Sequence, residues 1–488
     1  MKRDNTSRRR FLQSGAGLVA GMAAVSADSG RAADPPSSAR PAANAPSASP
    51  SGAQTYREPA QEVPVLGRFE VIVCGGGAAG CAAALAAARQ GAKTLLVERE
   101  GYLGGTCVMA LVNVVLSTNG ADFQGVWHEW AHTLQKLNGI AKLHRSKNKH
   151  TVVGWWLRNS VDPEMVKCVW DKLLTAAGVT LLHHAHLAGA IVEQGQVRGV
   201  LVETIAGRRA LYAQRVIDCT GDAAVCARAG AVCDQGYGGS ALGMGVDLIG
   251  LRSSGQESVL FESEGGGGTV AKRPERRVGF RMREVDVLDP WGLSAATQKG
   301  RQQIWGQGQV VGKPYLILTA SRLGVRSTRR VRGIATVTAA DAYAFRKYPD
   351  GIARSSWEID IHPASADPIP VSLKNVNEEY RQWQRRLAEG EYFDIRYGCL
   401  VVKGVDHLLV AGRCLSAEHE AQSSLRIQQT CMATGQAAGT AAALSLKQNV
   451  TPRELDPLQV VKQVDQDRAA VEPAFELCKE LPLASRPS

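Results

Sequence analysis

The sequence has few aromatic residues, no closely paired cysteines and no long apolar run, and each shortage excludes a class of protein. Aromatic residues make up 6% of the 488 residues, and no nucleic-acid-binding motif is present. The eleven cysteines are odd in number and no two are spaced C-x-x-C, which argues against a disulfide framework or a cysteine metal site. We expect them to be small, buried apolar side chains. No stretch reaches about 18 uninterrupted apolar residues, so no membrane span is expected after processing.

The net charge and the histidines are weak signals. The formal net charge is +11 at pH 7, and residues 1–27 contribute five basic side chains and one acidic side chain to it. The remaining positive charge is spread along the chain, as on a solvated surface or on a surface that attracts anionic substrates. His183, His184 and His186 form a cluster. At strand spacing His184 and His186 would share a face, but without a nearby carboxylate pair we expect no metal site.

The N-terminus has the three parts of an export signal. A basic segment, Ser7–Gln13 (SRRRFLQ), precedes a mildly apolar stretch over Ser14–Val25, and small residues follow up to Ala27. This order is typical of a secretory signal, and the paired arginines before Phe-Leu resemble the twin-arginine type. We therefore expect a signal peptide over 1–27 and export in folded form by the twin-arginine machinery, to the periplasm or the extracellular space. Residues 28–65, rich in Pro, Ser and Ala, predict a disordered linker.

A complete dinucleotide-binding pattern begins at Phe69. The β-rich run Phe69–Cys74 leads directly into Gly75–Gly80 (GGGAAG), then an Ala-rich helical stretch over Cys81–Gln90, a second strand over Thr94–Val97, and Glu98. This is G-x-G-x-x-G in the order strand, tight turn, helix, strand and acid. The pattern predicts that a dinucleotide binds at the turn.

Each position of the pattern has a physical role. Gly75 permits the sharp turn, Gly77 lets the backbone approach a diphosphate, and Gly80 lets helix and strand pack closely. The diphosphate would lie at the helix N-terminus, where free N–H groups and the helix dipole favour anions. Glu98 would accept hydrogen bonds from the adenosine ribose.

Later stretches favour FAD over NAD. Arg99 follows Glu98, and the glycine pair of Leu103–Thr106 (LGGT) resembles the FAD site of the glutathione-reductase-type flavoproteins. Two more predicted strands end in polar turns, and a Gly/Ala-rich helix follows the second, with its N-terminus aimed at the flavin. The first strand follows a hairpin-like stretch; these segments are Gly189–Ala213, Arg215–Asp222, Leu408–Arg413 and Cys431–Leu446.

From Leu66 to about Gln448 the chain resembles the broad FAD-dependent oxidoreductase family, whose members often carry twin-arginine signals. The most specific match starts at Ala411–Ser416 (AGRCLS) and continues through Gln422–Arg426 (QSSLR) to Met432–Gly439 (MATGQAAG). Earlier matches are Leu323–Gly333, Thr338–Asp341 and Asp360–His362. Arg396 departs from the pattern, because related chains more often have Pro before Tyr397, and this change is expected to reshape a loop near the flavin.

The resemblance implies an α/β fold, with a doubly wound, Rossmann-like FAD-binding domain and an inserted mixed α+β substrate domain. We expect the FAD-binding domain over 66–120, 178–235 and 395–450, the substrate domain over 121–177 and 236–394, and a C-terminal helix and tail over 451–488. The residues expected to contact FAD are Gly75, Gly77, Ala78, Ala79, Gly80, Glu98, Arg99, Gly104, Gly105, Thr106, Leu187, Gly221, Asp222, Gly412, Arg413 and Gly435.

Two observations restrict the chemistry. Cys107 follows Gly-Gly-Thr, as in disulfide reductases, but position 112 is Val112, and a dithiol relay needs two thiols. No second G-x-G-x-x-G stands between a strand and a helix; the glycines at 238, 239, 243 and 245 lack that setting. We expect electrons to pass between a small-molecule substrate and an external acceptor rather than through a second nucleotide domain.

The catalytic candidates are His362, Arg326 and Arg426. A neutral His362 can act as a base, or it is a structural histidine beside the site. Arg326 clamps a carboxylate or forms a salt bridge between the insertion and the core, and Arg426 precedes the flavin-facing helix. Tyr397 is a weaker candidate proton donor. The adjacent aromatics Trp155-Trp156 either stack on a sugar-like substrate or fill the core.

These patterns predict an exported FAD-dependent dehydrogenase or reductase that acts on a small organic molecule. Two alternatives stay open. One is a flavin oxidase or monooxygenase that uses oxygen, and the other is a non-catalytic protein stabilised by FAD. The substrate and the oligomeric state do not follow from the sequence.

Overall fold

The computed structural model of the chain describes residues 55–147, 155–236, 244, 246–253, 275–306, 316–362 and 378–479. The predicted signal over 1–27, most of the linker over 28–65 and the glycines at 238–239 lie outside these residues. Among the described residues, no helix combines the length and apolar character that crossing a membrane requires.

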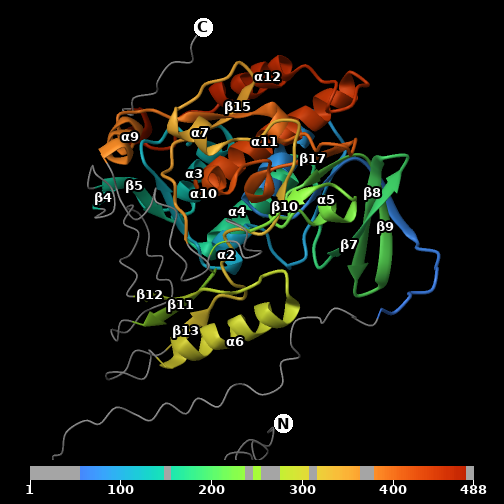
Figure 1. Cartoon of the computed structure of the whole chain (residues 1–488), viewed down its shortest axis with the longest axis horizontal. Coiled ribbons are helices and arrows are strands. Elements are labelled where there is room, and N and C mark those ends of the chain that lie inside the picture. Colours follow the sequence, from blue (N-terminus) through green and yellow to red (C-terminus); the bar gives the residue numbers. More distant parts are fainter. Residues whose placement is uncertain are drawn as a thin grey trace, which may run out of the picture. The chain divides into compact units, whose positions relative to one another are not determined.

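A central sheet of seven described strands organises the molecule (Figure 1). Parallel pairs join β6, β2, β1, β9 and β17, and an antiparallel meander joins β9, β8 and β7. This is the parallel-strand α/β class that the sequence predicts. The strands are β1 (Val65–Cys74), β2 (Thr94–Val97), β6 (Thr180–Leu182), β7 (His186–Glu193), β8 (Gln196–Thr204), β9 (Gly207–Asp218) and β17 (Leu408–Val410).

The predicted strand over 94–97 is confirmed residue for residue, whereas the strand predicted over Leu408–Arg413 ends at Val410 and is followed by a 3-10 turn. The sheet is assembled from distant parts of the chain, because β17 pairs with β9 about two hundred residues after it. The expectation that His184 shares a strand face with His186 is wrong. β6 ends at Leu182, and His184 has φ +54° in the turn before β7.

Two glycine- and alanine-rich helices pack against one another beside the sheet. They are α1 (Ala78–Arg89) and α11 (Gln428–Lys447), and each begins three residues before its predicted start. Their backbones come unusually close, because a Cβ at Gly435 would overlap the carbonyl of Ala79, and one at Gly439 would overlap that of Ala83. Small side chains on both helices therefore set their separation.

Replacing Gly439 by Ala should lower the free energy of unfolding by about 1–3 kcal/mol, because the added methyl group must push α11 away from α1. Chemical denaturation measures this. Gly279→Ala is the matched control, since its Cβ would meet nothing nearer than 3.8 Å, and surface changes of that kind stay within about 0.5 kcal/mol. Equal stability of the two variants would contradict the close helix contact.

The remaining elements form layers around this centre. Between β2 and β6 lie α2 (Thr106–Met109), α3 (Val126–Lys136), α4 (Pro163–Ala176) and the small antiparallel sheet of β3 (Val114–Ser117), β5 (Trp155–Ser160) and β4 (His144–Lys147). After β9 come α5 (Ala224–Arg228) and the pair β10 (Cys233–Asp234) with β14 (Arg330–Val331). Further elements are α7 (Ala339–Tyr343), β15 (Gly351–Ser355), α9 (Glu378–Ala388), β16 (Phe393–Arg396), η1 (Tyr397–Cys399), η2 (Gly412–Cys414), α10 (His419–Leu425), α12 (Pro457–Ala469) and α13 (Glu476–Lys479).

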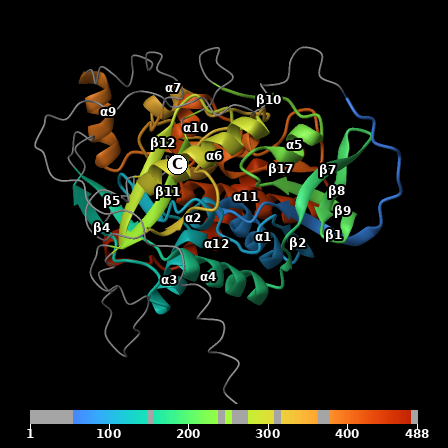
Figure 2. The same cartoon turned by 90° about the horizontal axis from the view of Figure 1, so that it is seen from below.

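One layer has an apolar core of its own. It consists of β11 (Val246–Ser253), β12 (Glu275–Met282), β13 (Leu316–Thr319) and α6 (Pro290–Gly306), which lies along β11 and β12 in both views (Figures 1 and 2). α6 buries Ala296, Gly300 and Ile304, whose spacing of four places them on one helical face. The domain boundaries predicted from the sequence stay predictions.

Candidate active site

The carboxyl ends of the parallel strands open into a cavity of about 890 Å³. Cys74 and Val97 are the last residues of β1 and β2, and Cys219 and Ala411 directly follow β9 and β17; all four line the cavity. In parallel α/β sheets, ligands bind at this edge. The volume is within the range of about 300–1,000 Å³ that is typical of small-molecule and cofactor sites.

The turn between β1 and α1 forms one end of the cavity. Gly75 has φ +99°, and its Cβ would stand 2.6 Å from the carbonyl oxygen of Cys219. Gly77 is the N-cap of α1 and no side chain caps the helix, so the first amides of the helix, at the cavity wall with Ala78 and Ala79, are available for an anion. A glycine turn with free backbone amides and no obstructing side chains suits a diphosphate.

Glu98 ties this turn to the end of β2. The buried carboxylate accepts hydrogen bonds from the amide of Gly76 at 2.6 Å and from the amide of Glu100 at 2.9 Å, and it lines the cavity. Each carboxylate oxygen accepts more than one hydrogen bond, so Glu98 is able to bind a ribose hydroxyl as the sequence predicts. Arg99 lines the same wall.

A second glycine loop meets the first. The amide of Gly104 donates to the carbonyl of Gly76 at 2.9 Å, and a Cβ at Gly105 would stand 2.7 Å from the Cα of Gly77. Gly105 and Thr106 line the cavity at this junction.

An ion pair joins two of the predicted FAD contacts. Arg413 Nη2 donates to Asp222 Oδ1 at 2.8 Å, and Thr328 Oγ1 donates to the same oxygen at 3.0 Å. Burial by itself would raise the pKa of Asp222, but Arg413 holds it below the ordinary value. Gly221, Asp222, Gly412 and Arg413 all line the cavity.

Of the residues expected to contact FAD, all but Gly80, Gly104 and Gly435 line the cavity, Leu187 included. The exceptions have packing roles. A Cβ at Gly80 would overlap the carbonyl of Gly75, and Gly435 contacts α1 through Ala79.

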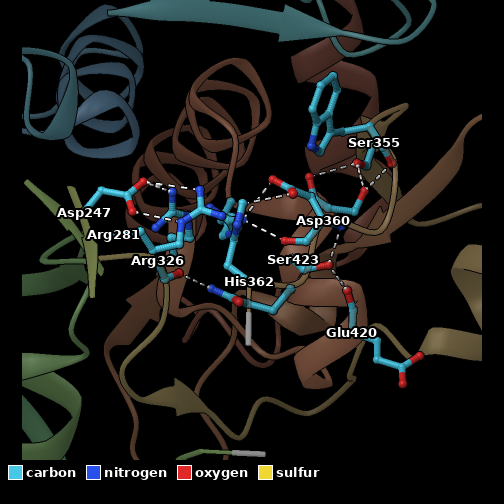
Figure 3. A network of polar contacts seen from close by, with 12 residues as sticks. Asp247, Arg281, Arg326, Ser355, Asp360, His362, Glu420 and Ser423 are labelled. Atoms are coloured by element: carbon cyan, nitrogen blue, oxygen red, sulfur yellow. Dashed lines mark hydrogen bonds and ion pairs between the residues drawn. The ribbon is translucent and has the colours of Figure 1, made fainter. Parts of the chain in front are cut away.

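The three catalytic candidates line one part of the cavity. His362 Nε2 lies 3.0 Å from Asp360 Oδ1 (Figure 3). Arg426 Nη2 donates to the backbone carbonyl of Asp360 at 2.8 Å and to its Oδ2 at 3.1 Å. Burial would raise the pKa of Asp360, but the hydrogen bond from His362 and the charge of Arg426 hold it far below the ordinary value. Burial lowers the pKa of His362, with Asp360 acting in the opposite direction. At neutral pH the pair is therefore a carboxylate and a neutral imidazole.

Arg326 forms the salt bridge considered for it and also lines the cavity. It forms an ion pair with Asp247 on β11, so it joins the inserted layer to the site (Figure 3). Arg281 Nε also donates to Asp247, at 3.0 Å. All three side chains line the cavity. With His362 neutral, Arg281, Arg326 and Arg426 face Asp247 and Asp360, so positive charge is in excess.

Several apolar side chains line the cavity, and Trp156 alone among them was a candidate from the sequence. These side chains come from α2, the following loop, β3, β5 and the segment after β15, and they are Met109, Val112, Val114, Leu116, Trp156 and Trp357. The ring centroids of Trp156 and Trp357 lie 5.7 Å apart. Trp155 does not line the cavity and instead carries Arg145 over its ring at 4.5 Å. Glu358 and Asp360 also line the cavity. Their spacing of two residues from one another and from His362, which places all three on one face of an extended segment, could have indicated this from the sequence.

Several expectations are wrong. Tyr397 does not face the cavity; its buried hydroxyl donates to the carbonyl of Pro452 at 2.6 Å, so it is no proton donor there. Arg396 forms an ion pair with Asp350 at 3.0 Å and does not line the cavity either. The cysteines are all free, and most are buried, but Cys168 is exposed.

Comparisons with known proteins agree with this geometry. A family model described as FAD dependent oxidoreductase matches residues 70–244 and 253–466. Over 45 residues the chain is 49% identical to a dihydrolipoyl dehydrogenase from Trypanosoma brucei brucei and 51% identical to a glutathione reductase from Schizosaccharomyces pombe. These matches cover 9% of this chain and 9% and 10% of the two relatives, so the chain matches about a tenth of their length.

Solved structures show weaker likenesses over longer stretches. A geranylgeranyl bacteriochlorophyll reductase-like protein from Thermoplasma acidophilum is 12% identical over 82% of each chain, with a TM-score of 0.42. An anhydrotetracycline hydroxylase from Streptomyces rimosus is 12% identical over 83% of this chain and 70% of its own, with a TM-score of 0.42.

Proposed function

The chain belongs to the FAD-dependent oxidoreductase family, so it is an enzyme with FAD as cofactor, and from this premise we propose that it transfers hydride between a small organic substrate and FAD. An external electron acceptor or donor completes the cycle. FAD when bound supplies a ring system that accepts or gives hydride. The residues around the cavity fit it: the Gly75–Gly80 turn and the first turn of α1 would hold the diphosphate, and Glu98 would hold the ribose.

The observation that carries the proposal is the contact of His362 with Asp360, in the cavity that also contains the glycine turn. A carboxylate only accepts hydrogen bonds, so His362 Nε2 carries the ring proton and donates a hydrogen bond to Asp360. In the neutral ring, Nδ1 is then the acceptor. In the oxidation direction it takes the proton that the substrate loses together with its hydride. In the reduction direction the protonated ring returns it.

The other side chains bind and orient the substrate. Arg326 and Arg426 place positive charge beside the site, which favours substrates that carry an oxygen anion or develop one during the reaction. Trp156 and Trp357 supply flat apolar surface in the same cavity. A small molecule with a polar, oxygen-bearing end and an apolar body matches this division.

The experiment is anaerobic mixing of the purified, flavin-loaded protein with a panel of candidate hydroxy, oxo and unsaturated acids. A substrate should bleach the visible flavin absorption, and a separate acceptor should restore it. Oxygen consumption coupled to turnover would instead indicate an oxidase or a monooxygenase. A flavin that stays oxidised with every donor, and a reduced flavin that no candidate reoxidises, would contradict the proposal and favour a binding protein.

We also propose that the enzyme is exported in folded form, on the basis of the twin-arginine pattern around Arg8 and Arg9. Replacing both by Lys keeps the charge but removes the pattern. The variant should stay, flavin-loaded, in the cytoplasmic fraction, whereas the unchanged chain appears outside it. Equal export of both proteins in cell fractionation would count against this route.

A further inference from the structure

An acidic side chain beside the proposed dyad has no place in the mechanism so far. Glu358, Asp360 and His362 all line the cavity, whereas the intervening Ile359 and Ile361 pack into the apolar core. This is the alternation of an extended segment, with every second side chain on one face. Three acid–base groups therefore stand in a row on one wall of the cavity.

The two carboxyl groups have different neighbours. Asp360 contacts His362 and Arg426. Glu358 instead accepts a hydrogen bond at Oε2 from the side-chain amide of Gln384, on α9, at 3.0 Å. Among the described residues, no arginine, lysine or histidine forms an ion pair with Glu358. The charged or titratable groups that act on it are Asp360 on its own segment and Tyr380 on α9.

These surroundings keep Asp360 ionised and leave Glu358 mostly protonated below about pH 7. Burial, together with the negative charge of Asp360, raises the pKa of Glu358 to about 7. Asp360 stays ionised, for the reasons given above. Two neighbouring carboxyl groups that differ in this way are the usual division between an acid and a base.

A protonated carboxyl group has one O–H donor to place. Gln384 donates to Oε2, so the proton belongs on Oε1, and no described residue accepts from that oxygen. The side chain lines the cavity, so the remaining partner is a molecule bound there. We propose that Glu358 is a further catalytic residue, a carboxylic acid that donates a hydrogen bond to an oxygen atom of the substrate. This rests on the proposed function and makes the substrate a hydroxy or oxo compound.

The role follows from charge development at that oxygen. When a carbonyl carbon gains hydride, or a hydroxyl group loses its proton, negative charge grows on the oxygen in the transition state. A neutral O–H donor stabilises this charge by a hydrogen bond, whereas an ionised carboxylate at the same place would repel it. His362 handles the proton, and Glu358 holds the oxygen.

The test uses the flavin-loaded protein and the best donor from the anaerobic screen. In the unchanged enzyme, the rate constant for flavin reduction should fall as pH rises through about 7, because Glu358 loses its proton there and the donor is lost. Glu358→Gln keeps a neutral donor of the same shape and should remove this decline. Glu358→Ala lacks the donor and should be about ten- to hundredfold slower at pH 6, in line with the low end of general-acid effects.

Asp122→Asn is the matched control. Asp122 is also buried, with its pKa raised by burial to about 6, but it contacts Ser117 and Gln429 and does not line the cavity. The decline near pH 7 should persist in this variant. Persistence of the decline in Glu358→Gln, or its loss in Asp122→Asn alone, would overturn the assignment.

A second measurement does not depend on turnover. In protein labelled with ¹³C at the glutamate carboxyl carbons, one resonance should titrate near pH 7 and be missing from the spectrum of Glu358→Gln. Absence of such a resonance would overturn the proposal even if substrates are found. If no donor bleaches the flavin but the resonance is present, the proposed function fails and the protonated state of Glu358 stands.

Discussion

Replacing His362 by Gln should slow flavin reduction by a good donor about 10²- to 10⁴-fold, the range lost when a positioned general base is removed. The glutamine can still donate to Asp360, so the ion pair of Asp360 with Arg426 should survive. The bound flavin should therefore keep its absorption spectrum while its reduction becomes slow. Stopped-flow spectroscopy under anaerobic conditions gives the rate constant directly.

His128→Gln is the control for this experiment. His128 is likewise buried, with its pKa lowered by burial to about 4, but its ring accepts from the amide of Ala474 and does not line the cavity. This variant should lose some thermal stability and keep its rate of flavin reduction within about twofold. Unchanged reduction in His362→Gln would remove His362 from the mechanism and leave it a structural histidine.

Replacing Gly77 by Ala should separate folding from flavin binding. The backbone of Gly77 has φ −79° and ψ −173°, which alanine adopts freely, and the new Cβ would meet nothing in the protein nearer than 3.8 Å. The methyl group would instead occupy cavity space where the diphosphate approaches the turn. Loss of one hydrogen bond to a charged group costs about 1.5–3 kcal/mol, so the Kd for FAD should rise about ten- to hundredfold.

Equilibrium dialysis or the fluorescence of released flavin measures this Kd, and denaturation of the flavin-free protein measures folding. Gly279→Ala, at a residue that does not itself line the cavity and has room for a Cβ, should change neither. Gly80→Ala gives the opposite pattern to Gly77→Ala, because its Cβ would overlap the carbonyl of Gly75 and disturb the fold itself. A Gly77→Ala protein that retains flavin as tightly as the unchanged chain would place the diphosphate elsewhere.

Local patterns in the sequence were enough to predict the dinucleotide turn. The strand–turn–helix–strand order around Gly75 and the strand before Gly412 depend on short-range propensity and on glycine, and both are visible in a few residues. Helix starts were less accurate. α1 begins at Ala78 because Cys81 N bonds to Gly77 O, and residues as small as Ala78 and Ala79 give no apolar periodicity to indicate this.

The substrate side of the cavity could be predicted only in part. Arg326, His362 and Arg426 were recognised from short motifs, but Asp247 and Trp357 reach the site from separate layers, and no short-range pattern joins them. Tyr397 shows the reverse error. It lies beside Arg396 in a stretch expected near the flavin, but its hydroxyl donates to the carbonyl of Pro452 in the core.

The order in which the strands enter the sheet constrains when a growing chain can hold its flavin. The diphosphate turn leaves the ribosome early, but β17 and α11, which complete the cavity, are translated after the whole inserted layer. A nascent polypeptide that stops before residue 428 lacks α11, which lines the cavity through Gln428, Gln429 and Cys431 and packs closely against α1. We therefore expect stable flavin binding only late in biosynthesis, when nearly the entire polypeptide has folded.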